Sequence, residues 1–87
     1  MSTKTIWIVE YGCLEYRDML TFSAAFSTEQ EAFGYAVRMA NEQAEALSEE
    51  DDSFYTLLVL VHDEVRVVSK RTSNATDWYQ VRKVPLG

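Results

Sequence analysis

A helical period in the middle of the chain separates two groups of strand-like segments. Apolar residues recur three and four positions apart, at Phe33, Ala36, Val37, Ala40, Ala44 and Leu47, which is the pattern of an amphipathic helix. Ser27 and Gln30 can form a reciprocal capping box at its start, and Thr28 with Glu31 offers an alternative. We therefore predict one long helix over Ser27–Asp52. The three alanines in its stripe indicate a close approach to a sheet.

Two strand-like segments precede the helix. Residues 6–11 are mostly β-branched or aromatic and are apolar at both parities, which predicts a strand that is central or covered on both faces. Gly12 and Cys13 follow at the position of a turn. The next run, 15–26, alternates, and its apolar parity carries Tyr16, Leu20, Phe22, Ala24 and Phe26. The pattern predicts an antiparallel hairpin with one buried face.

Three strand-like segments follow the helix. Residues 54–61 form the most apolar run of the chain and neither parity is polar, so we predict that this strand is central. After a short turn, residues 65–72 and 78–84 have strand patterns, and Pro85 ends the last one. The order ββαβββ predicts an α+β fold, a single long helix packed on an antiparallel sheet, with one domain over residues 1–87.

The composition is that of an ordinary globular protein. Apolar residues make up 47% and charged residues 25% of the 87 residues. No apolar run approaches the roughly 18 residues needed to span a bilayer, and the N-terminus lacks the pattern of a secretion signal. The single cysteine, Cys13, has no partner for an internal disulfide, which favours a reducing environment. We expect a cytoplasmic protein that binds no membrane.

The net charge is concentrated at the end of the predicted helix. The chain has a formal net charge of −6. Six carboxylates together account for it: Glu42, Glu45, Glu49, Glu50, Asp51 and Asp52. A basic C-terminal hairpin carries Arg66, Lys70, Arg71, Arg82 and Lys83. The negative balance disfavours direct binding to nucleic acid or to an anionic membrane.

Few residues have the pattern of a catalytic or metal site. His62 lies in a predicted turn beside two carboxylates, where it is a solvated turn residue or, alternatively, a base or a metal ligand. Cys13 is a small buried residue or, alternatively, a nucleophile. The chain has no glycine-rich phosphate loop, no Cys or His pair at metal spacing and no serine elbow. We expect no catalytic residue, no metal and no cofactor, and hence not an enzyme.

The acidic residues share one face of the predicted helix. At about 100° per residue, Glu42, Glu45, Glu49 and Asp52 fall within about 80° of one another. Their charges repel, and those in the last turn oppose the negative end of the helix dipole. Such a pattern is typical of a surface kept for a partner. We predict that these four residues, with Glu50 and Asp51, bind a basic partner. The alternatives are a solvated face, or one that the basic hairpin neutralises within the molecule.

Apolar residues outside the helical stripe suggest two further interfaces. Tyr35 and Met39 lie on the helix flank next to Glu42, where they either extend the partner surface or form the edge of the core. One helix covers only one face of five strands, and aromatic residues recur in the strands, namely Trp7, Tyr11, Trp78 and Tyr79. We predict that a second copy of the protein covers the other face as a homodimer.

In its size, acidity, element order and lack of catalytic residues, the chain resembles the small acidic proteins that bacteriophages and other mobile elements encode to block host machinery, anti-CRISPR proteins among them. No residue carries over from that resemblance. It implies a stoichiometric inhibitor that occupies a nucleic-acid-binding surface of a host protein or nucleoprotein complex. The six carboxylates would then act as phosphate substitutes facing Lys and Arg of the target.

Two other functions remain open on the sequence. In the first, the protein is a homo-oligomeric structural or accessory protein, the exposed sheet face is its interface and the acidic helix end is merely solvated. In the second, it is a small enzyme or ligand carrier that uses His62 or Cys13.

Overall fold

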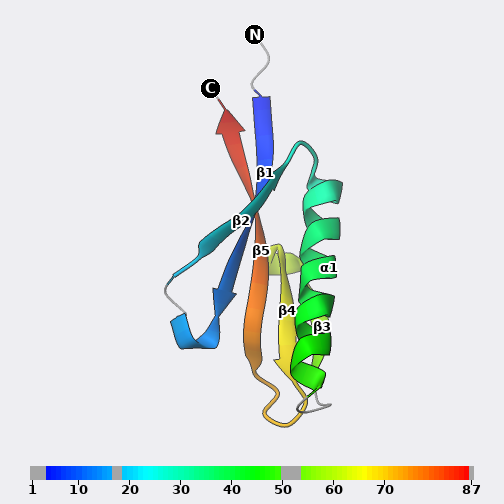
Figure 1. Cartoon of the computed structure of the whole chain (residues 1–87). Helices are drawn as coiled ribbons and strands as arrows, with labels where there is room; N and C mark the ends of the chain where they lie inside the picture. The colour runs from blue at the N-terminus through cyan, green and yellow to red at the C-terminus, as the bar shows by residue number, and fades with distance from the viewer. Residues whose placement is uncertain (1–3, 17–18, 50–53, 87) are drawn as a thin grey trace.

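The computed structural model describes residues 4–16, 19–49 and 54–86, and it shows one helix on one face of a five-stranded antiparallel sheet (Figure 1). The elements are, in order, β1 (Lys4–Cys13), the 3₁₀ turn η1 (Leu14–Tyr16), β2 (Thr21–Phe26), α1 (Glu29–Ser48), β3 (Phe54–Val59), the 3₁₀ turn η2 (Leu60–His62), β4 (Glu64–Ser69) and β5 (Ala75–Leu86). The predicted α+β fold and its order ββαβββ are confirmed. In these ranges, no helix combines the length and the apolar character that a membrane span requires.

The helix begins with Thr28 as its N-cap, as the second of the two predicted capping boxes requires, but among the described residues the Glu31 carboxylate bonds to the hydroxyls of Thr28 and Ser27 and not to the Thr28 backbone N–H. The Thr28 hydroxyl oxygen accepts a hydrogen bond from the Glu31 backbone N–H at 3.2 Å, and the same hydroxyl donates to the Glu31 carboxylate at 2.9 Å. Glu31 and Glu29 also lie at the positive end of the helix dipole. The first helical residue is therefore Glu29 and not Ser27. The helix ends at Ser48, with Glu49 as its C-cap, and the predicted extension to residues 50–52 lies outside the described residues.

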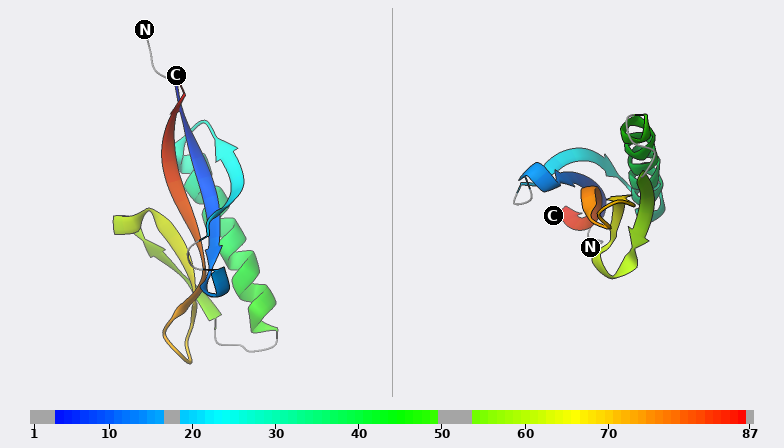
Figure 2. Two further views of the ribbon diagram at one scale, coloured as in Figure 1. Left: turned by 90° about the vertical axis from the view of Figure 1, so that its left-hand side faces the viewer. Right: turned by 90° about the horizontal axis from the view of Figure 1, so that it is seen from below.

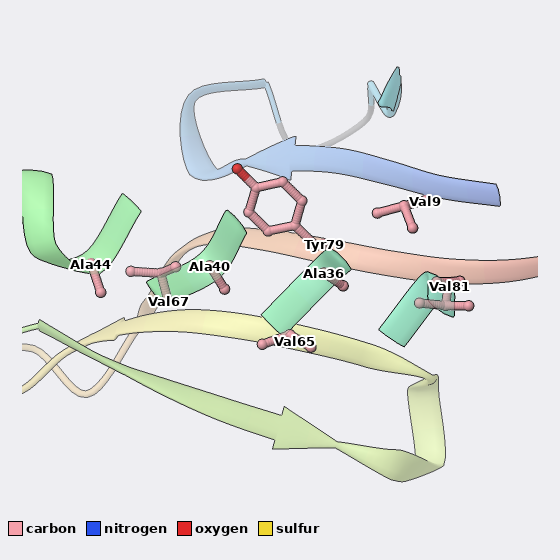
Figure 3. Packing of buried hydrophobic residues seen from close by; sticks show 9 residues of the cluster. Val9, Ala36, Ala40, Ala44, Val65, Val67, Tyr79 and Val81 are labelled. Carbon is pink, nitrogen blue, oxygen red and sulfur yellow. The ribbon is translucent and has the colours of Figure 1, made fainter. Parts of the chain in front are cut away.

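A line of alanines holds the helix close to the sheet. Ala32, Ala36, Ala40 and Ala44 are buried at four-residue spacing. They face Val9 of β1, Tyr79 and Val81 of β5, and Val65 and Val67 of β4 (Figure 3). Because an alanine side chain is a single methyl group, the helix backbone can approach the strands closely. Ala32 was not part of the predicted stripe, and Val37, which was, is 38% exposed because the alanine line turns it toward the sheet edge.

The sheet is centred on β5 and not on the apolar run that precedes η2. The strand order is β2-β1-β5-β4-β3, so β3 is an edge strand and the prediction of a central strand at 54–61 is wrong. The prediction relied on apolar residues at both parities of this run, and both faces of β3 are indeed apolar. They are not covered, however: Leu57 is 44% exposed and Leu58 is 48% exposed. By contrast, one of the two alternatives predicted for residues 6–11, a strand inside the sheet, is confirmed, because β1 pairs with both β2 and β5.

A bulge in β2 reverses the predicted buried face of the first hairpin. The register steps from Val9↔Ala24 to Glu10↔Phe22, so Ser23 is the extra residue. Phe22 consequently lies beside Glu10 on the face away from the helix, where it is 62% exposed. The prediction that the even-numbered residues of 15–26 share one buried face is therefore wrong at Phe22. Residues 15–16 belong to η1 and not to a strand, and residues 17–18 lie outside the described residues.

The alanine line yields a test of the close helix–sheet contact. We expect Ala40→Leu to lower the free energy of unfolding by about 1–3 kcal/mol, because the larger side chain forces the fully buried contact apart. Ala46→Leu, on the exposed side of the same helix, should change it by less than about 0.5 kcal/mol. Urea denaturation of the two variants measures both values. Equal stabilities would contradict the tight packing.

Candidate functional site

The acidic residues of α1 lie on its solvent-facing side. Glu42, Glu45 and Glu49 are all exposed, and they are three and four positions apart on the side opposite the alanine line. Within the described part of the chain, no ion pair joins any of these three carboxylates to a basic side chain. Glu50, Asp51 and Asp52, which were predicted to share this role, lie outside the described residues. We call Glu42, Glu45 and Glu49 the acidic face.

The acidic face is electrostatically unfavourable in the free protein. The last turn of α1 contains no basic residue, and the backbone N–H of Glu49 bonds to the carbonyl of Leu47. Carboxylates in this position oppose the negative end of the helix dipole, and neighbours three or four apart repel, each by a few tenths of a kcal/mol. A cationic partner would relieve both effects. The arrangement therefore favours contact with positive charge.

Three basic residues of the C-terminal hairpin contact other partners than the acidic face. Arg66 forms an ion pair with Glu64, and the Arg82 guanidinium lies 2.9 Å from the Glu10 carboxylate, both on the face of the sheet away from the helix. Lys83 lies 5.8 Å from the centre of the Trp7 ring. The turn between β4 and β5, which carries Lys70 and Arg71, lies at the same end of the molecule as the last turn of α1 (Figures 1 and 2). This turn is the part of the hairpin that lies at the acidic end of α1, and Arg38 adds a positive charge on α1 itself, one turn before Glu42.

Tyr35 and Met39 lie at the edge of the core. Both are half-buried and pack against the buried cluster. The Tyr35 hydroxyl is 2.7 Å from the Ser23 hydroxyl, and its ring centre is 5.2 Å from that of Phe26, so Tyr35 joins α1 to β2. Arg38 lies over the same ring at 5.6 Å. These contacts give Tyr35 a structural role. Partner binding by Tyr35 and Met39 stays a prediction.

Charged pairs occupy the middle of the open face of the sheet. Glu10, Gln80 and Glu64 lie side by side across three strands, and the two glutamates are neutralised by Arg82 and Arg66. Their side chains are largely buried, at 15% exposure for Glu10 and 12% for Glu64. This face is therefore not one continuous apolar surface. A homodimer through it stays a prediction.

The aromatic residues that suggested this homodimer divide between the two faces. Tyr11 and Tyr79 lie on the helix side, with ring centres 5.1 Å apart. Trp78 lies on the open face directly over Gly12, where a Cβ atom would be 2.2 Å from the indole nitrogen. Any larger residue at position 12 would force the Trp78 ring to move. Trp78 is thus a structural cover for β1.

A buried carboxylate that the sequence did not reveal lies between the helix and the sheet. Asp77 of β5 is 6% exposed and accepts hydrogen bonds from the hydroxyls of Tyr11 and of Thr76, the latter at 2.9 Å. Burial raises the pKa of Tyr11 above its ordinary value, and the hydrogen bond and negative charge of Asp77 act in the same direction. Burial likewise raises the pKa of Tyr79, again with Asp77 as the next cause. Tyr11 and Asp77 are 66 positions apart, and no local pattern could have paired them.

Neither residue that suggested catalysis lies in a recognisable catalytic arrangement. Cys13 is half-buried at the end of β1, opposite Asp77 in the register. His62 is exposed in η2. Over the described ranges, no group of three or more His, Cys, Asp and Glu side chains could hold a metal ion.

The buried pair yields a test with a defined pH dependence. Below the ordinary tyrosine pKa of about 10, Tyr11 is neutral in both folded and unfolded protein. Above it the unfolded chain loses protons that the folded protein keeps, so the free energy of unfolding falls as pH rises. We expect Tyr11→Phe to cost about 1–2 kcal/mol at neutral pH and to reduce this fall above pH ~10. Urea denaturation at neutral and alkaline pH measures both effects.

Tyr55→Phe is the matched control, because Tyr55 is 39% exposed. It should leave both the stability and its alkaline fall unchanged. The same alkaline slope in Tyr11→Phe and the parent protein would show that Tyr11 is not the group responsible.

Comparison with protein-family models, with curated proteins and with solved structures finds no match for this chain.

Proposed function

We propose that this protein acts by binding and not by catalysis, and that its acidic face docks on a basic, nucleic-acid-binding surface of another protein. The observation that carries the proposal is the set of exposed carboxylates at Glu42, Glu45 and Glu49, which have no ion-pair partner in the described part of the chain. Glu45 and Glu49 also stand at the unfavourable end of the helix dipole. A cation bound there would relieve the repulsion among these carboxylates, and that gain in free energy would add to the affinity.

The consequence of such binding is inhibition. A row of carboxylates three and four residues apart along a helix presents negative charges about 5–6 Å from one another. A surface that holds the phosphates of a nucleic acid with Lys and Arg would accept such a row and would then be closed to its own ligand. The resemblance in size and charge to inhibitors encoded by mobile elements supports the same proposal. The lone cysteine fits a cytoplasmic location.

The proposal is tested by removing charge from the acidic face. We expect the tagged parent protein to retain a basic protein from bacterial lysate at low salt and to release it at moderate salt. Glu42→Gln together with Glu49→Gln should weaken that complex about tenfold or more, mainly through slower association, as surface plasmon resonance with the purified partner would measure. The same two substitutions should leave the fold intact or stabilise it slightly, because they relieve repulsion at the helix end.

Glu15→Lys is the matched control, because it raises the net charge by the same two units at an exposed position outside α1. It should leave the affinity within about twofold of the parent. Equal losses in the two variants would show that only net charge matters, and an unchanged complex in the double variant would remove the acidic face from the binding surface.

A further inference from the structure

Two hollows lie between α1 and the edge strand β3, and we call them together the groove. One hollow of about 450 Å³ lies between the C-terminal half of the helix and the start of β3; its lining includes Asn41, Glu45, Ser48, Phe54 and Thr56. A second hollow of about 380 Å³ lies between the N-terminal half of the helix and the end of β3; its lining includes Glu29, Phe33, Val37, Leu58 and Leu60. Gly34 widens this second hollow, since no atom lies within 4 Å of the position of a Cβ there.

The outer side of the groove is a strand edge that can still form hydrogen bonds. β3 is the last strand of the sheet and pairs only with β4 among the described elements, so its outward backbone groups are available. Proteins usually protect such an edge with a charge or a proline. No residue between Phe54 and Val61 is charged and none is proline. Beyond the strand, Leu60 and Val61 are 71% and 83% exposed. The edge is thus suited to pairing with another strand.

The residues that line the groove indicate which side chains an added strand would have. The Thr56 hydroxyl donates a hydrogen bond of 2.9 Å to the Asn41 side chain, and both residues of this polar bridge line the first hollow. Phe54 and Leu58 flank it on the same face of β3, four residues apart, which is about 13 Å along a strand. An added strand would therefore place apolar side chains four positions apart in the two hollows. The position midway between them faces the polar bridge and suits serine or threonine.

The charges at the ends of the groove distinguish between possible occupants. Glu29 lies at one end and Glu45 at the other, and the described lining of both hollows contains no basic residue. A second copy that paired antiparallel through β3 would reverse its own helix, so that its Glu29 end would approach the Glu45 end of the first copy. Like charges would then meet at both ends. A segment with Lys or Arg on either side of its apolar positions meets opposite charges instead.

We propose that the groove between α1 and β3 binds an extended segment of the partner protein by β-strand addition, and that this segment carries two apolar residues four positions apart, flanked by basic residues. The proposal rests on the proposed function for the basic character of the partner, and it adds where and in what conformation the partner binds. Glu45 belongs both to the acidic face and to the groove, so one partner can contact the two surfaces together.

A synthetic peptide tests the groove without knowledge of the partner. The probe has two valines four positions apart, threonines between them and two basic residues at each end, and a second peptide replaces the basic residues with glutamate. We expect the basic peptide, added to isotope-labelled protein, to shift the amide resonances of residues 54–60 and of the helix side of the groove. The glutamate peptide should bind at least about tenfold more weakly.

Variants of the full chain locate the site. Leu58→Lys should weaken binding of the basic peptide about tenfold or more. Val37→Lys, on the helix side of the groove, should have the same effect. Both side chains are exposed, at 48% and 38%, so we expect both variants to fold. Phe22→Lys, on the opposite edge strand, is the control and should bind as the parent does. Glu45→Gln should bind more weakly than Glu42→Gln, because Glu45 lines the groove and Glu42 does not.

Each outcome decides between occupants. No resonance shift at millimolar peptide, or shifts confined to β2, would overturn the proposal. A protein that sediments as a dimer, with β3 shifts that depend on its own concentration and a peptide that does not compete, would assign the groove to a second copy. If the peptide binds as expected but Glu42→Gln with Glu49→Gln leaves partner capture unchanged, the groove stands and the proposed role of the acidic face falls.

Discussion

The close contact between one helix and a five-stranded sheet is the constraint on which the rest of the molecule depends. The alanine line from Ala32 to Ala44 lets α1 lie against β5, β4 and β1 with little side-chain volume between them. A helix is about 10 Å wide, whereas five strands at a spacing of about 4.8 Å extend over roughly 20 Å. One helix therefore cannot cover the whole sheet. The uncovered regions are the open face and the two edges (Figure 2).

The protein treats these uncovered regions in different ways. On the open face, the sheet's own side chains supply the contacts: two arginines neutralise Glu10 and Glu64, and Trp78 covers Gly12. The edge at β3 has no comparable protection and exposes Leu57 and Leu58 together with its backbone. The acidic face of α1 adjoins that edge through Glu45. Unprotected backbone, apolar hollows and uncompensated negative charge thus occur on one side of the molecule, which is the combination that a protein-binding surface requires.

Local sequence signals were sufficient for the fold class and narrowed the start of the helix to two neighbouring caps. The helical period and the N-cap contact of Thr28 with Glu31 depend on residues three and four apart, so the sequence itself displays both. The position of a strand within the sheet depends on pairing between distant segments. An apolar run such as 54–61 looks the same whether its two faces are buried by the protein or left for a partner. The bulge at Ser23 was hidden for a similar reason, because it is defined by the register against β1.

The candidate site was predictable only in part. Exposure of Glu42, Glu45 and Glu49 follows from their positions opposite the alanine stripe on a helix. The groove does not follow from the sequence, because it needs the placement of β3 beside α1. The pairing of Tyr11 with Asp77 also needs the β1–β5 register, which brings residues 66 positions apart into contact.

The central claim is that the partner contacts the side of the molecule formed by β3 and the acidic face. Hydrogen exchange tests this claim most directly, when it is measured on the free protein and on its complex with a captured partner. In the free protein, we expect the amides of β5 to be protected and about half of those of β3 to exchange rapidly, because an edge strand pairs on one side only. In the complex, the protection gained should be concentrated at residues 54–60. Protection gained instead on β2, with β3 unchanged, would contradict the claim.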